Sequence, residues 1–326
     1  FVRCALGDDG DLVGLGGEHA GKIDKRMSDT EFKAGFIAVV GRPNVGKSTL
    51  VNTLLGQKIS IVTARPQTTR HRILGILNRE HAQLILVDTP GLHRHKGKAI
   101  NRSMNRAAAS SLVEADVVAF VVDAMRFTDE DEDVLKRVQQ AGLPCILVVN
   151  KVDQIKDKSR LLPFMQELAS RHEFAAVVPV SALSGKNVDT LEKEMVALLP
   201  DSPLLFPSDQ TTDKSEAFMA AEIIREKLMT RVHQELPYGL TVEVEQYSHD
   251  EEGRVLVQAI IWVGRAGHKG IVIGKSGQVL KQIGREARIE LKKRVRKPVH
   301  LDLWVKVLEN WSDSERALQR FGYETA

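Results

Sequence analysis

The strongest constraint on the fold is a strand, a glycine-rich turn and a helix that follow one another without a gap. An apolar run at 36–40 leads into G-R-P-N-V-G-K-S at 41–48, and a helix-like run continues to residue 55. Glycines let the backbone turn with its N–H groups facing inward, and the helix adds its positive end. This pattern predicts a phosphate-binding loop. Taken alone, it has a simpler alternative, which is a glycine-rich turn without a ligand.

The residues of this loop are expected to hold phosphates and a metal ion. Lys47 is expected to reach the β and γ phosphates, and the Ser48 hydroxyl is expected to bind Mg²⁺. The other members line the turn and the start of the helix. The expected nucleotide contacts of the loop are Gly41, Asn44, Val45, Gly46, Lys47, Ser48 and Thr49.

A second polar box, D-T-P-G at 88–91, ends the apolar run 84–87. An Asp at the carboxyl end of a strand lies beside phosphates bound at that edge, so Asp88 can hold Mg²⁺ through water. Gly91 can donate its N–H to the γ phosphate. An Asp after a strand is more commonly a turn or helix-cap residue. This box therefore indicates a phosphate site only in combination with the other boxes.

The third box, N-K-V-D at 150–153, follows the run 145–149 and predicts which base is bound. Asp153 can accept hydrogen bonds from guanine N1 and the exocyclic amine, an arrangement that adenine does not present. A site that leaves such a carboxylate unpaired rejects the wrong base. Lys151 can cover the base with its aliphatic stem, and Asn150 can brace the phosphate loop.

The fourth box follows the run 176–180 and consists of Ser181, Ala182 and Leu183. The Ala182 N–H is expected near guanine O6. Each box alone is a weak signal, but four of them in this order predict a guanine-nucleotide site. A metabolic kinase would use the same phosphate loop, and the box at 150–153 argues against it.

The spacing of the apolar runs predicts an α/β domain over residues 34–199. Strand-like runs alternate with helix-like segments, which is typical of a mostly parallel sheet with helices on both faces. A strand at 72–78 is expected to lie antiparallel at the edge. The parallel strands are expected at 36–40, 84–87, 117–122, 145–149 and 176–180.

The C-terminal part predicts a second, α+β domain after a linker at 200–215, which carries three prolines. A helix at 216–235, strands at 240–248 and 254–263, a short helix ending at 273, a helix at 278–295 and a strand at 299–307 follow. With G-K-S-G at 274–277 between two helices, this order resembles a type II KH RNA-binding domain over 216–311. A short capped helix is expected in the tail, 312–326.

Charge in this domain favours contact with nucleic acid. Residues 265–297 contain eleven Lys or Arg against two Glu. On the helix 278–295, Leu280, Ile283, Ala287 and Leu291 form an apolar stripe, and Lys281, Arg285, Arg288 and Lys292 lie on another face. A tight turn and a solvated helix surface are the alternatives, but the cationic excess favours phosphate contact. The expected RNA contacts are Gly274, Lys275, Ser276, Gly277, Lys281, Arg285 and Arg288.

The four boxes resemble those of the translation-factor-like GTPases, and the C-terminal domain narrows the resemblance to the bacterial Era family, over about residues 34–320. The resemblance implies GTP hydrolysis with GTP, GDP and Mg²⁺, binding of the 3′ end of 16S ribosomal RNA, and a role in biogenesis of the small (30S) subunit. Residues 67–71 match the family's first switch and are called the switch segment below. Thr69 is favoured over Thr68 as its Mg²⁺ ligand, and Lys47, Thr69 and Gly91 are the expected catalytic groups.

Two positions near the phosphates bear on the rate of hydrolysis. Leu92 stands where many GTPases carry a water-orienting Gln, so we expect slow intrinsic turnover. An Asn at the position of Asn44 helps to coordinate K⁺ in related GTPases, and simple loop geometry is an equally good interpretation. His93 and His95 lie in the second switch region and are not assigned a catalytic role.

The first 33 residues, the two cysteines and the length of the apolar runs bear on where the protein acts in the cell. Residues 1–33 are interpreted as a disordered or artefactual extension. Cys4 and Cys145 form no disulfide framework, and no apolar run approaches the ~20 residues that span a bilayer. We expect a cytoplasmic monomer whose association with the inner membrane, where it occurs, is peripheral. The alternative function is an RNA-binding scaffold that senses GTP and GDP without useful turnover.

Overall fold

The computed structural model describes residues 32–91, 97–124, 126–232 and 239–323. Residues 31–326 form one compact unit. Leu92, His93, His95 and the expected leader up to residue 31 lie outside the described residues. In the described part of the chain, no helix is both long enough and apolar enough to cross a membrane.

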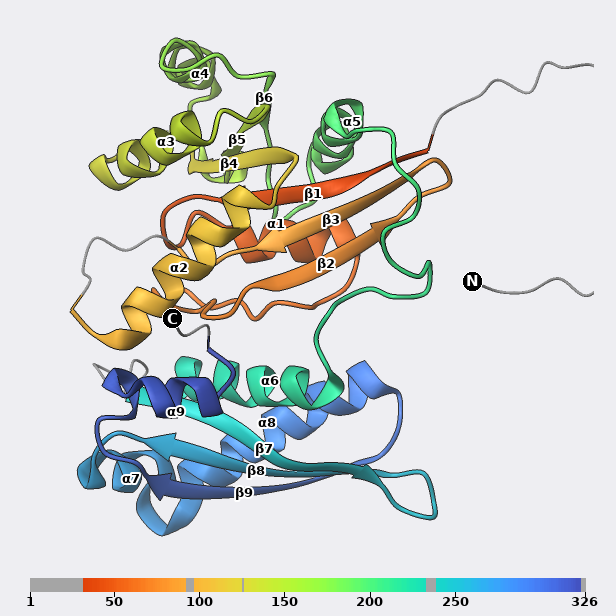
Figure 1. Cartoon of the computed structure of the whole chain (residues 1–326). Helices are drawn as coiled ribbons and strands as arrows, with labels where there is room; N and C mark the ends of the chain where they lie inside the picture. The colour runs from red at the N-terminus through yellow and green to blue at the C-terminus, as the bar shows by residue number, and fades with distance from the viewer. Residues whose placement is uncertain (1–31, 92–96, 125, 233–238, 324–326) are drawn as a thin grey trace, which may run out of the picture. The chain divides into compact units, whose positions relative to one another are not determined.

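The N-terminal domain contains a six-stranded sheet in the order β2-β3-β1-β4-β5-β6 (Figure 1). The edge strand β2 is antiparallel to β3, and the other neighbours are parallel, as the sequence predicted. The strands are β1 (Lys33–Val40), β2 (Ile73–Asn78), β3 (Ala82–Asp88), β4 (Val117–Asp123), β5 (Cys145–Asn150) and β6 (Ala176–Pro179).

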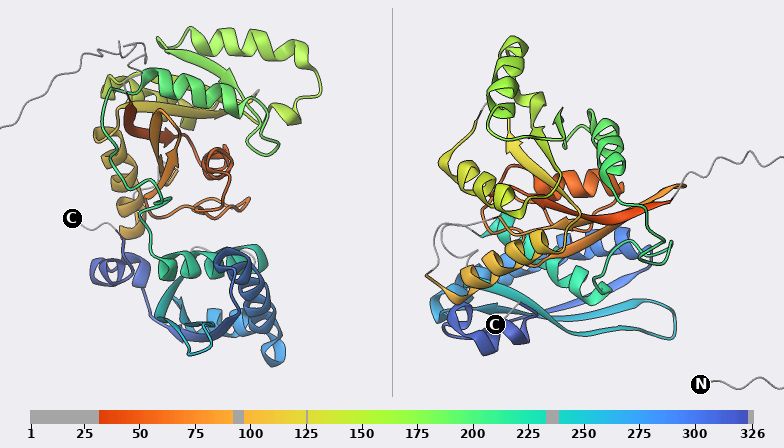
Figure 2. Two further views of the ribbon diagram at one scale, coloured as in Figure 1. Left: turned by 90° about the vertical axis from the view of Figure 1, so that its right-hand side faces the viewer. Right: turned by 45° about the horizontal axis from the view of Figure 1, so that its top comes forward.

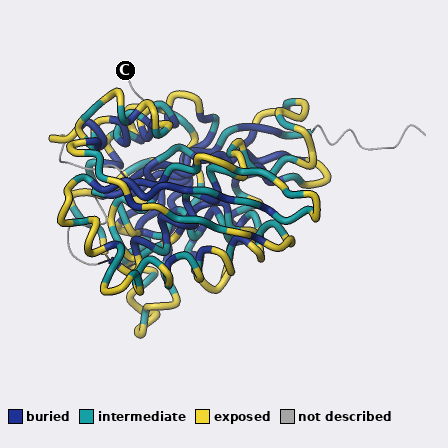
Figure 3. Tube along the Cα trace, turned by 90° about the horizontal axis from the view of Figure 1, so that it is seen from below, coloured by how far each residue is buried: buried dark blue, intermediate teal, exposed yellow. Residues whose placement is uncertain are grey.

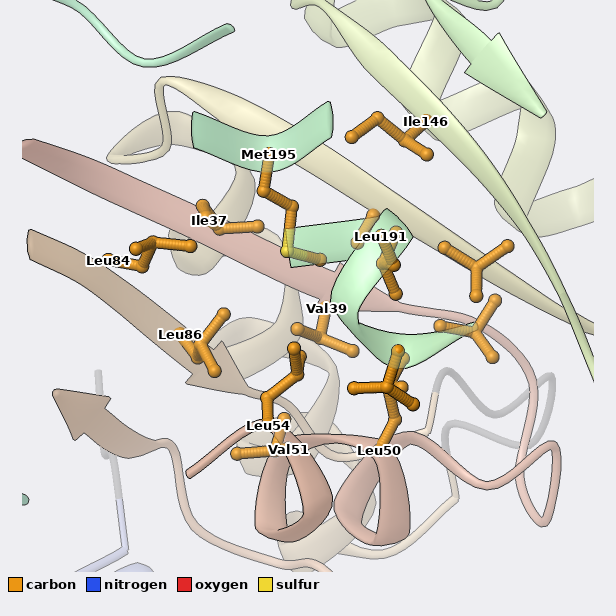
Figure 4. Close-up of a cluster of buried hydrophobic side chains, with 14 of the residues drawn as sticks. Ile37, Val39, Leu50, Val51, Leu54, Leu84, Leu86, Ile146, Leu191 and Met195 are labelled. Atoms are coloured by element: carbon orange, nitrogen blue, oxygen red, sulfur yellow. The ribbon is translucent and has the colours of Figure 1, made fainter. Parts of the chain in front are cut away.

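Helices cover both faces of this sheet (Figure 2). Successive side chains of a strand point to opposite faces, so continuous apolar strands fill two cores. One core joins β1 and β3 to α1 and α5 through side chains such as Ile37, Leu50 and Leu191 (Figure 4). The other lies beneath α2, α3 and α4. These helices are α1 (Lys47–Leu55), α2 (Ala99–Val113), α3 (Asp129–Ala141), α4 (Leu161–Ala169) and α5 (Val188–Leu198).

The segment that the sequence predicts as a linker lies against the β2 edge of the sheet. The Ile76 N–H donates to the Thr211 carbonyl at 3.0 Å, and the Leu74 N–H donates to the Asp213 carboxylate at 2.9 Å. The Gln83 side chain accepts from the N–H groups of Leu205 and Phe206. The segment therefore satisfies backbone groups that an edge strand otherwise leaves open.

The C-terminal domain has a three-stranded sheet in the order β7-β8-β9, with β7 antiparallel and β9 parallel to β8. Its core lies between this sheet and the helices α6 and α8. Figure 3 shows the buried parts of the chain in the interior and the exposed parts around the outside. The elements are α6 (Glu216–Arg231), β7 (Leu240–His249), β8 (Val255–Val263), α7 (Ala266–Ile273), α8 (Gln278–Val295) and β9 (Val299–Val307).

Short turns complete the described chain. The expected helix in the tail is α9 (Glu315–Arg320), where the Ser314 hydroxyl accepts from the Ala317 N–H. The helix expected at 216–235 ends at Arg231. Among the described residues, 3-10 turns lie at Val152–Gln154, Lys158–Arg160, Lys275–Gly277 and Trp311–Asp313.

The switch segment contacts elements from the C-terminal part of the chain. The buried Arg70 guanidinium donates to the Leu240 carbonyl at 2.8 Å. The His71 ring lies 4.3 Å from the Tyr323 ring and 5.2 Å from the Phe218 ring, measured between centroids. The loop that precedes β2 is therefore packed between the two domains.

Truncation of the core at β3 should destabilise the protein. Leu84 is fully buried between the sheet and α5. Leu84→Ala is expected to lower the free energy of unfolding by about 2–5 kcal/mol, because it removes apolar contacts and leaves a cavity. Urea denaturation measures the loss. Leu162→Ala on α4 is the control, since that side chain is 62% exposed and its truncation should change stability by less than about 0.5 kcal/mol. Equal losses in both variants would contradict this account.

Protonation of His71 should destabilise the fold. Burial lowers the pKa of His71 to about 4; Glu222 opposes this shift, while Arg225, Lys214 and Arg70 reinforce it. In the unfolded chain the His71 ring binds a proton near pH 6.5, whereas in the folded protein it does so only near pH 4. The stability contributed by the neutral His71 is therefore complete above pH 6.5 and is lost as the pH falls through 4. Between pH 7 and 4.5, the wild type should lose about 1–3 kcal/mol more than His71→Phe. Denaturation at both pH values measures this, and parallel losses would refute it.

Candidate functional site

The phosphate loop connects β1 to α1 and borders a cavity of about 340 Å³. Gly46 adopts φ +100°, and a Cβ atom there would lie 2.3 Å from the Asn150 side-chain nitrogen. Only glycine fits this conformation and this close approach without strain. The cavity is lined by Pro43, Asn44, Gly46, Lys47, Ser48, Thr49, residues 61–65, Gln67, Thr68, Thr69, Gly91 and Lys151.

Lys47 is held by the carbonyls of its own loop. Its ammonium donates to the carbonyl oxygens of Gly41 and Arg42, each at 3.0 Å. Burial lowers the pKa of Lys47 to about 8, although the nearby Asp88 carboxylate favours the charged form. A bound phosphate would offset the cost of burial, because an opposite charge favours protonation.

The predicted Mg²⁺ ligands lie near one another, and two of them, Ser48 and Thr69, line the cavity. The Ser48 and Thr69 hydroxyls are 2.8 Å apart. Asp88 is 0% exposed, and neither carboxylate oxygen has a hydrogen-bond partner of ordinary length. Burial raises the pKa of Asp88, while the hydroxyls of Ser60, Ser48 and Thr69 partly offset this effect. A buried carboxylate with open lone pairs beside two hydroxyls fits a hard divalent cation.

The geometry separates the two threonines of the switch segment. The Thr68 hydroxyl is bonded to the Arg65 carbonyl at 2.7 Å and to the Thr63 hydroxyl at 2.6 Å. Thr69 points to Ser48 instead. Thr69, which the sequence favours as the Mg²⁺ ligand, is thus the threonine whose hydroxyl lies beside Ser48. In the described part of the chain, no group of three or more His, Cys, Asp or Glu side chains suggests another metal site.

Asn150 connects three of the predicted boxes. Its side-chain amide donates to the Val45 carbonyl at 2.8 Å, which is the expected brace on the phosphate loop. Its side-chain oxygen accepts from the N–H groups of Lys151 at 2.8 Å and Ala182 at 2.9 Å. The Ala182 N–H, which the sequence predicts to face guanine O6, donates to the buried Asn150 oxygen in this structure.

The residues that the sequence predicts at the base differ in their exposure. The Lys151 ammonium donates to the Asn44 carbonyl and to the Asp123 carboxylate, each at 2.7 Å, so its stem crosses the loop. Asp153 lies in an exposed 3-10 turn, and Leu183 is 81% exposed. Of the last two boxes, Lys151 lines the cavity, whereas Asp153 and Leu183 are not among its lining residues.

Asn44, the candidate K⁺ ligand, joins the phosphate loop to the residues before the switch segment. It adopts φ +63°, and its side-chain amide donates to the Ala64 carbonyl at 3.2 Å. The amide oxygen is the atom that a cation would use. Both interpretations from the sequence, ion ligand and loop geometry, agree with this position.

Arg42 and Asp131 support the loop, and sequence reasoning missed both. The Arg42 Nε donates to the Asp131 carboxylate at 2.9 Å, and both side chains are buried. Asp131 also accepts from the N–H and hydroxyl of Thr128 at the start of α3. The acidic first turn of α3 was the available signal, but nothing in the sequence pairs it with the loop.

The C-terminal domain contains a groove of about 680 Å³ along α8. Gly274, three residues before the lining residue Gly277, has φ +73°, and a Cβ atom there would lie 2.4 Å from the Val279 side chain. Lys281, Arg285 and Arg288 are exposed, and none has an acidic partner among the described residues. The groove is lined by Gly277, Gln278, Leu280, Lys281, Gln282, Gly284, Arg285, Arg288, Leu301 and Leu303.

The predicted RNA residues thus divide between the groove and its rim. Gly277, Lys281, Arg285 and Arg288 line the groove, whereas Lys275 and Ser276 lie exposed in the preceding turn. Leu301 and Leu303 on β9 form the apolar floor, and sequence reasoning missed them. Their alternation along the strand was the available signal.

Comparisons with known proteins agree with this geometry. A model of the 50S ribosome-binding GTPase family matches residues 36–151, and a KH domain model matches residues 235–312. GTPase Era of Ectopseudomonas mendocina is 51% identical over 89% of this chain and 97% of its own length. GTPase Era of Pasteurella multocida is 50% identical over 92% of this chain and 98% of its own length. A variant of Aquifex aeolicus Era bound to GDP and AlF4⁻ has a TM-score of 0.87 and 40% identity, over 90% of this chain and 100% of its own. The chain therefore belongs to the Era family of GTPases.

Proposed function

We propose that this GTPase acts as a nucleotide-controlled RNA switch in the assembly of the small (30S) ribosomal subunit. Its KH domain binds the 3′ end of 16S ribosomal RNA, and the bound nucleotide controls that contact. The observation that carries the proposal is the presence, in one compact unit, of a phosphate site and a cationic groove joined through the switch segment. An Era structure at 40% identity holds MgGDPNP and nucleotides 1506–1542 of 16S ribosomal RNA.

Each residue around the cavity has its own role in the proposed hydrolysis of GTP. Lys47 leaves the loop carbonyls for the β and γ phosphates, and Gly91 contributes its N–H to the γ phosphate. Ser48, Thr69 and Asp88 hold Mg²⁺, which neutralises charge on the phosphates when it is bound. Asp153 selects guanine. These groups are preorganised donors and charges, the main source of catalysis in phosphoryl transfer.

Turnover is proposed to be slow without a partner or an activating ion. That proposal comes from Leu92, which lies outside the described residues. The RNA-binding scaffold without useful turnover remains the alternative, and measurable GTP hydrolysis would exclude it. We place the protein in the cytoplasm as a monomer, and a peripheral contact with the inner membrane stays a prediction.

RNA binding should depend on the nucleotide. The intact protein is loaded in turn with GDPNP and with GDP, and its affinity for an oligonucleotide of nucleotides 1506–1542 is measured by fluorescence anisotropy. Binding should be tighter with GDPNP and selective over a scrambled oligonucleotide. Arg285→Glu in the groove should weaken binding about tenfold or more, because it replaces a phosphate contact by repulsion.

The matched control is Lys193→Glu, which makes the same charge reversal on an exposed cation of α5 and should leave RNA affinity nearly unchanged. Equal binding in the two nucleotide states would contradict the switch. Equal losses in Arg285→Glu and Lys193→Glu would contradict the groove as the RNA site.

Potassium should accelerate hydrolysis if Asn44 holds an activating ion. Replacement of Na⁺ by K⁺ at constant ionic strength is expected to raise the GTP hydrolysis rate several-fold, because a cation beside the phosphates offsets developing charge. Phosphate release measures the rate. Asn44→Ala should remove the difference between the two salts. Identical wild-type rates in Na⁺ and K⁺ would leave loop geometry as the role of Asn44.

A further inference from the structure

Thr69 is held from both sides by the C-terminal domain. The Arg225 guanidinium, on α6, donates to the Thr68 carbonyl, one residue before Thr69. Arg70, one residue after it, donates to the Leu240 carbonyl at the start of β7. Both arginines are 1% exposed, so neither bond exchanges readily with water. The placement of the switch threonine therefore depends on elements outside the GTPase domain.

Arg225 is itself fixed by a buried ion pair. Its Nε and Nη2 atoms donate to the two oxygens of Glu222 at 2.7 and 2.6 Å, one helical turn earlier on α6. Bidentate pairing fixes the plane of the guanidinium as well as its position. Burial raises the pKa of Glu222, but the charge and hydrogen bonds of Arg225 outweigh it and hold that pKa below its ordinary value. The pair stays charged, and Arg225 has a donor left for Thr68.

The same helix holds the chain before the switch segment. The Glu226 carboxylate accepts from the Val62 N–H at 2.9 Å and pairs with the Lys58 ammonium at 2.7 Å. Val62 lines the nucleotide cavity. One face of α6 therefore contacts the loop 58–71 at two points, and Thr69 lies next to the second of them.

We propose that Arg225 is a positioning residue for GTP hydrolysis, holding the switch segment so that Thr69 reaches the Mg²⁺ site beside Ser48 and Asp88. This inference rests on the proposed function, since it requires that the site hydrolyse GTP with Mg²⁺. Arg225 touches neither nucleotide nor metal and acts through the backbone of Thr68. The KH domain thereby contributes to the catalytic competence of the GTPase domain.

The arrangement also gives a physical route between the RNA groove and the phosphates. On the same helix, Arg231 pairs with Glu286 of α8, and α8 lines the groove. A displacement of α6 that stretches the bond from Arg225 to Thr68 would release Thr69. Coupling between two sites requires such an element, whose state both sites can bias.

The test measures hydrolysis and nucleotide affinity in Arg225→Met. Methionine keeps a long apolar side chain beside Met229 but cannot donate to Thr68. We expect kcat to fall about tenfold, and half-saturation with Mg²⁺ to need about tenfold more metal, because an ordered ligand is lost. The affinity for GDP should stay within about twofold, since Thr69 is expected to bind the metal only in the GTP state. Arg225→Lys, which keeps the charge opposite Glu222, should recover part of the rate.

Thr230→Ala is the control, because it changes an exposed residue of the same helix whose hydroxyl donates to the Lys227 carbonyl within α6, and its kcat should equal that of the wild type. Loss of Arg225 alone strands the buried Glu222, which can unfold the protein. The double variant Glu222→Gln, Arg225→Met removes both charges and should show the same kinetic defect. Circular dichroism melting checks that each variant is folded.

The outcomes separate the inference from the function it rests on. A wild type without GTP hydrolysis would refute the proposed function. A wild type that hydrolyses GTP, with folded Arg225 variants of unchanged kcat and Mg²⁺ dependence, would refute the positioning role alone. Equal losses of GDP and GDPNP affinity would also refute it, because they indicate general damage to the site.

Discussion

The nucleotide site depends on the hydrogen bonds of one buried side chain, Asn150. Its amide group joins the phosphate loop at Val45 to the loop at Ala182, and its oxygen also holds the following residue. These loops follow different strands, and the Thr53 hydroxyl of α1 adds a further link by donating to the Ala182 carbonyl at 2.7 Å. A buried amide with all these partners is costly to disturb, because each lost partner leaves an unsatisfied polar group. The geometry of the whole cavity follows from this brace.

Around that brace, the site keeps charges that a protein interior normally excludes. Lys47 and Asp88 are buried at the same edge of the sheet. Burial lowers the pKa of Lys47 and raises the pKa of Asp88, and so favours the neutral form of each group. Phosphates would add negative charge beside Lys47, and a divalent cation would add positive charge beside Asp88, so both would favour the charged forms. The Asp88 oxygens have no hydrogen-bond partner of ordinary length, and the Lys47 ammonium donates only to carbonyls of its own loop among the described residues. Both observations are typical of a binding site. A protein that needed only stability would replace such groups by apolar ones.

The contact between the domains has a different character from the cores. It is built from buried arginines, a glutamate and stacked rings, with Arg225 and Glu222 paired on one side and Arg70 and His71 on the other. Directional bonds of this kind tolerate little displacement, whereas apolar contacts can slide. A small rotation of α6 would therefore change the hydrogen bonding of the switch segment in an all-or-none manner. If Arg225 has the positioning role proposed above, this contact lets the second domain control the GTPase site.

Much of this architecture could be read from the chain alone. The phosphate loop, the edge strand at β2 and the cationic face of α8 are local patterns, in which the backbone geometry follows from residues close in sequence. The hydrogen bond from the Ala182 N–H to Asn150 and the contact of Arg225 with Thr68, 157 residues away, could not be predicted this way. Local periodicity shows which face of an element is buried but not which element covers it. The boxes were thus visible in the sequence, while the links between them arise from packing, because long-range contacts form only when the whole chain has folded.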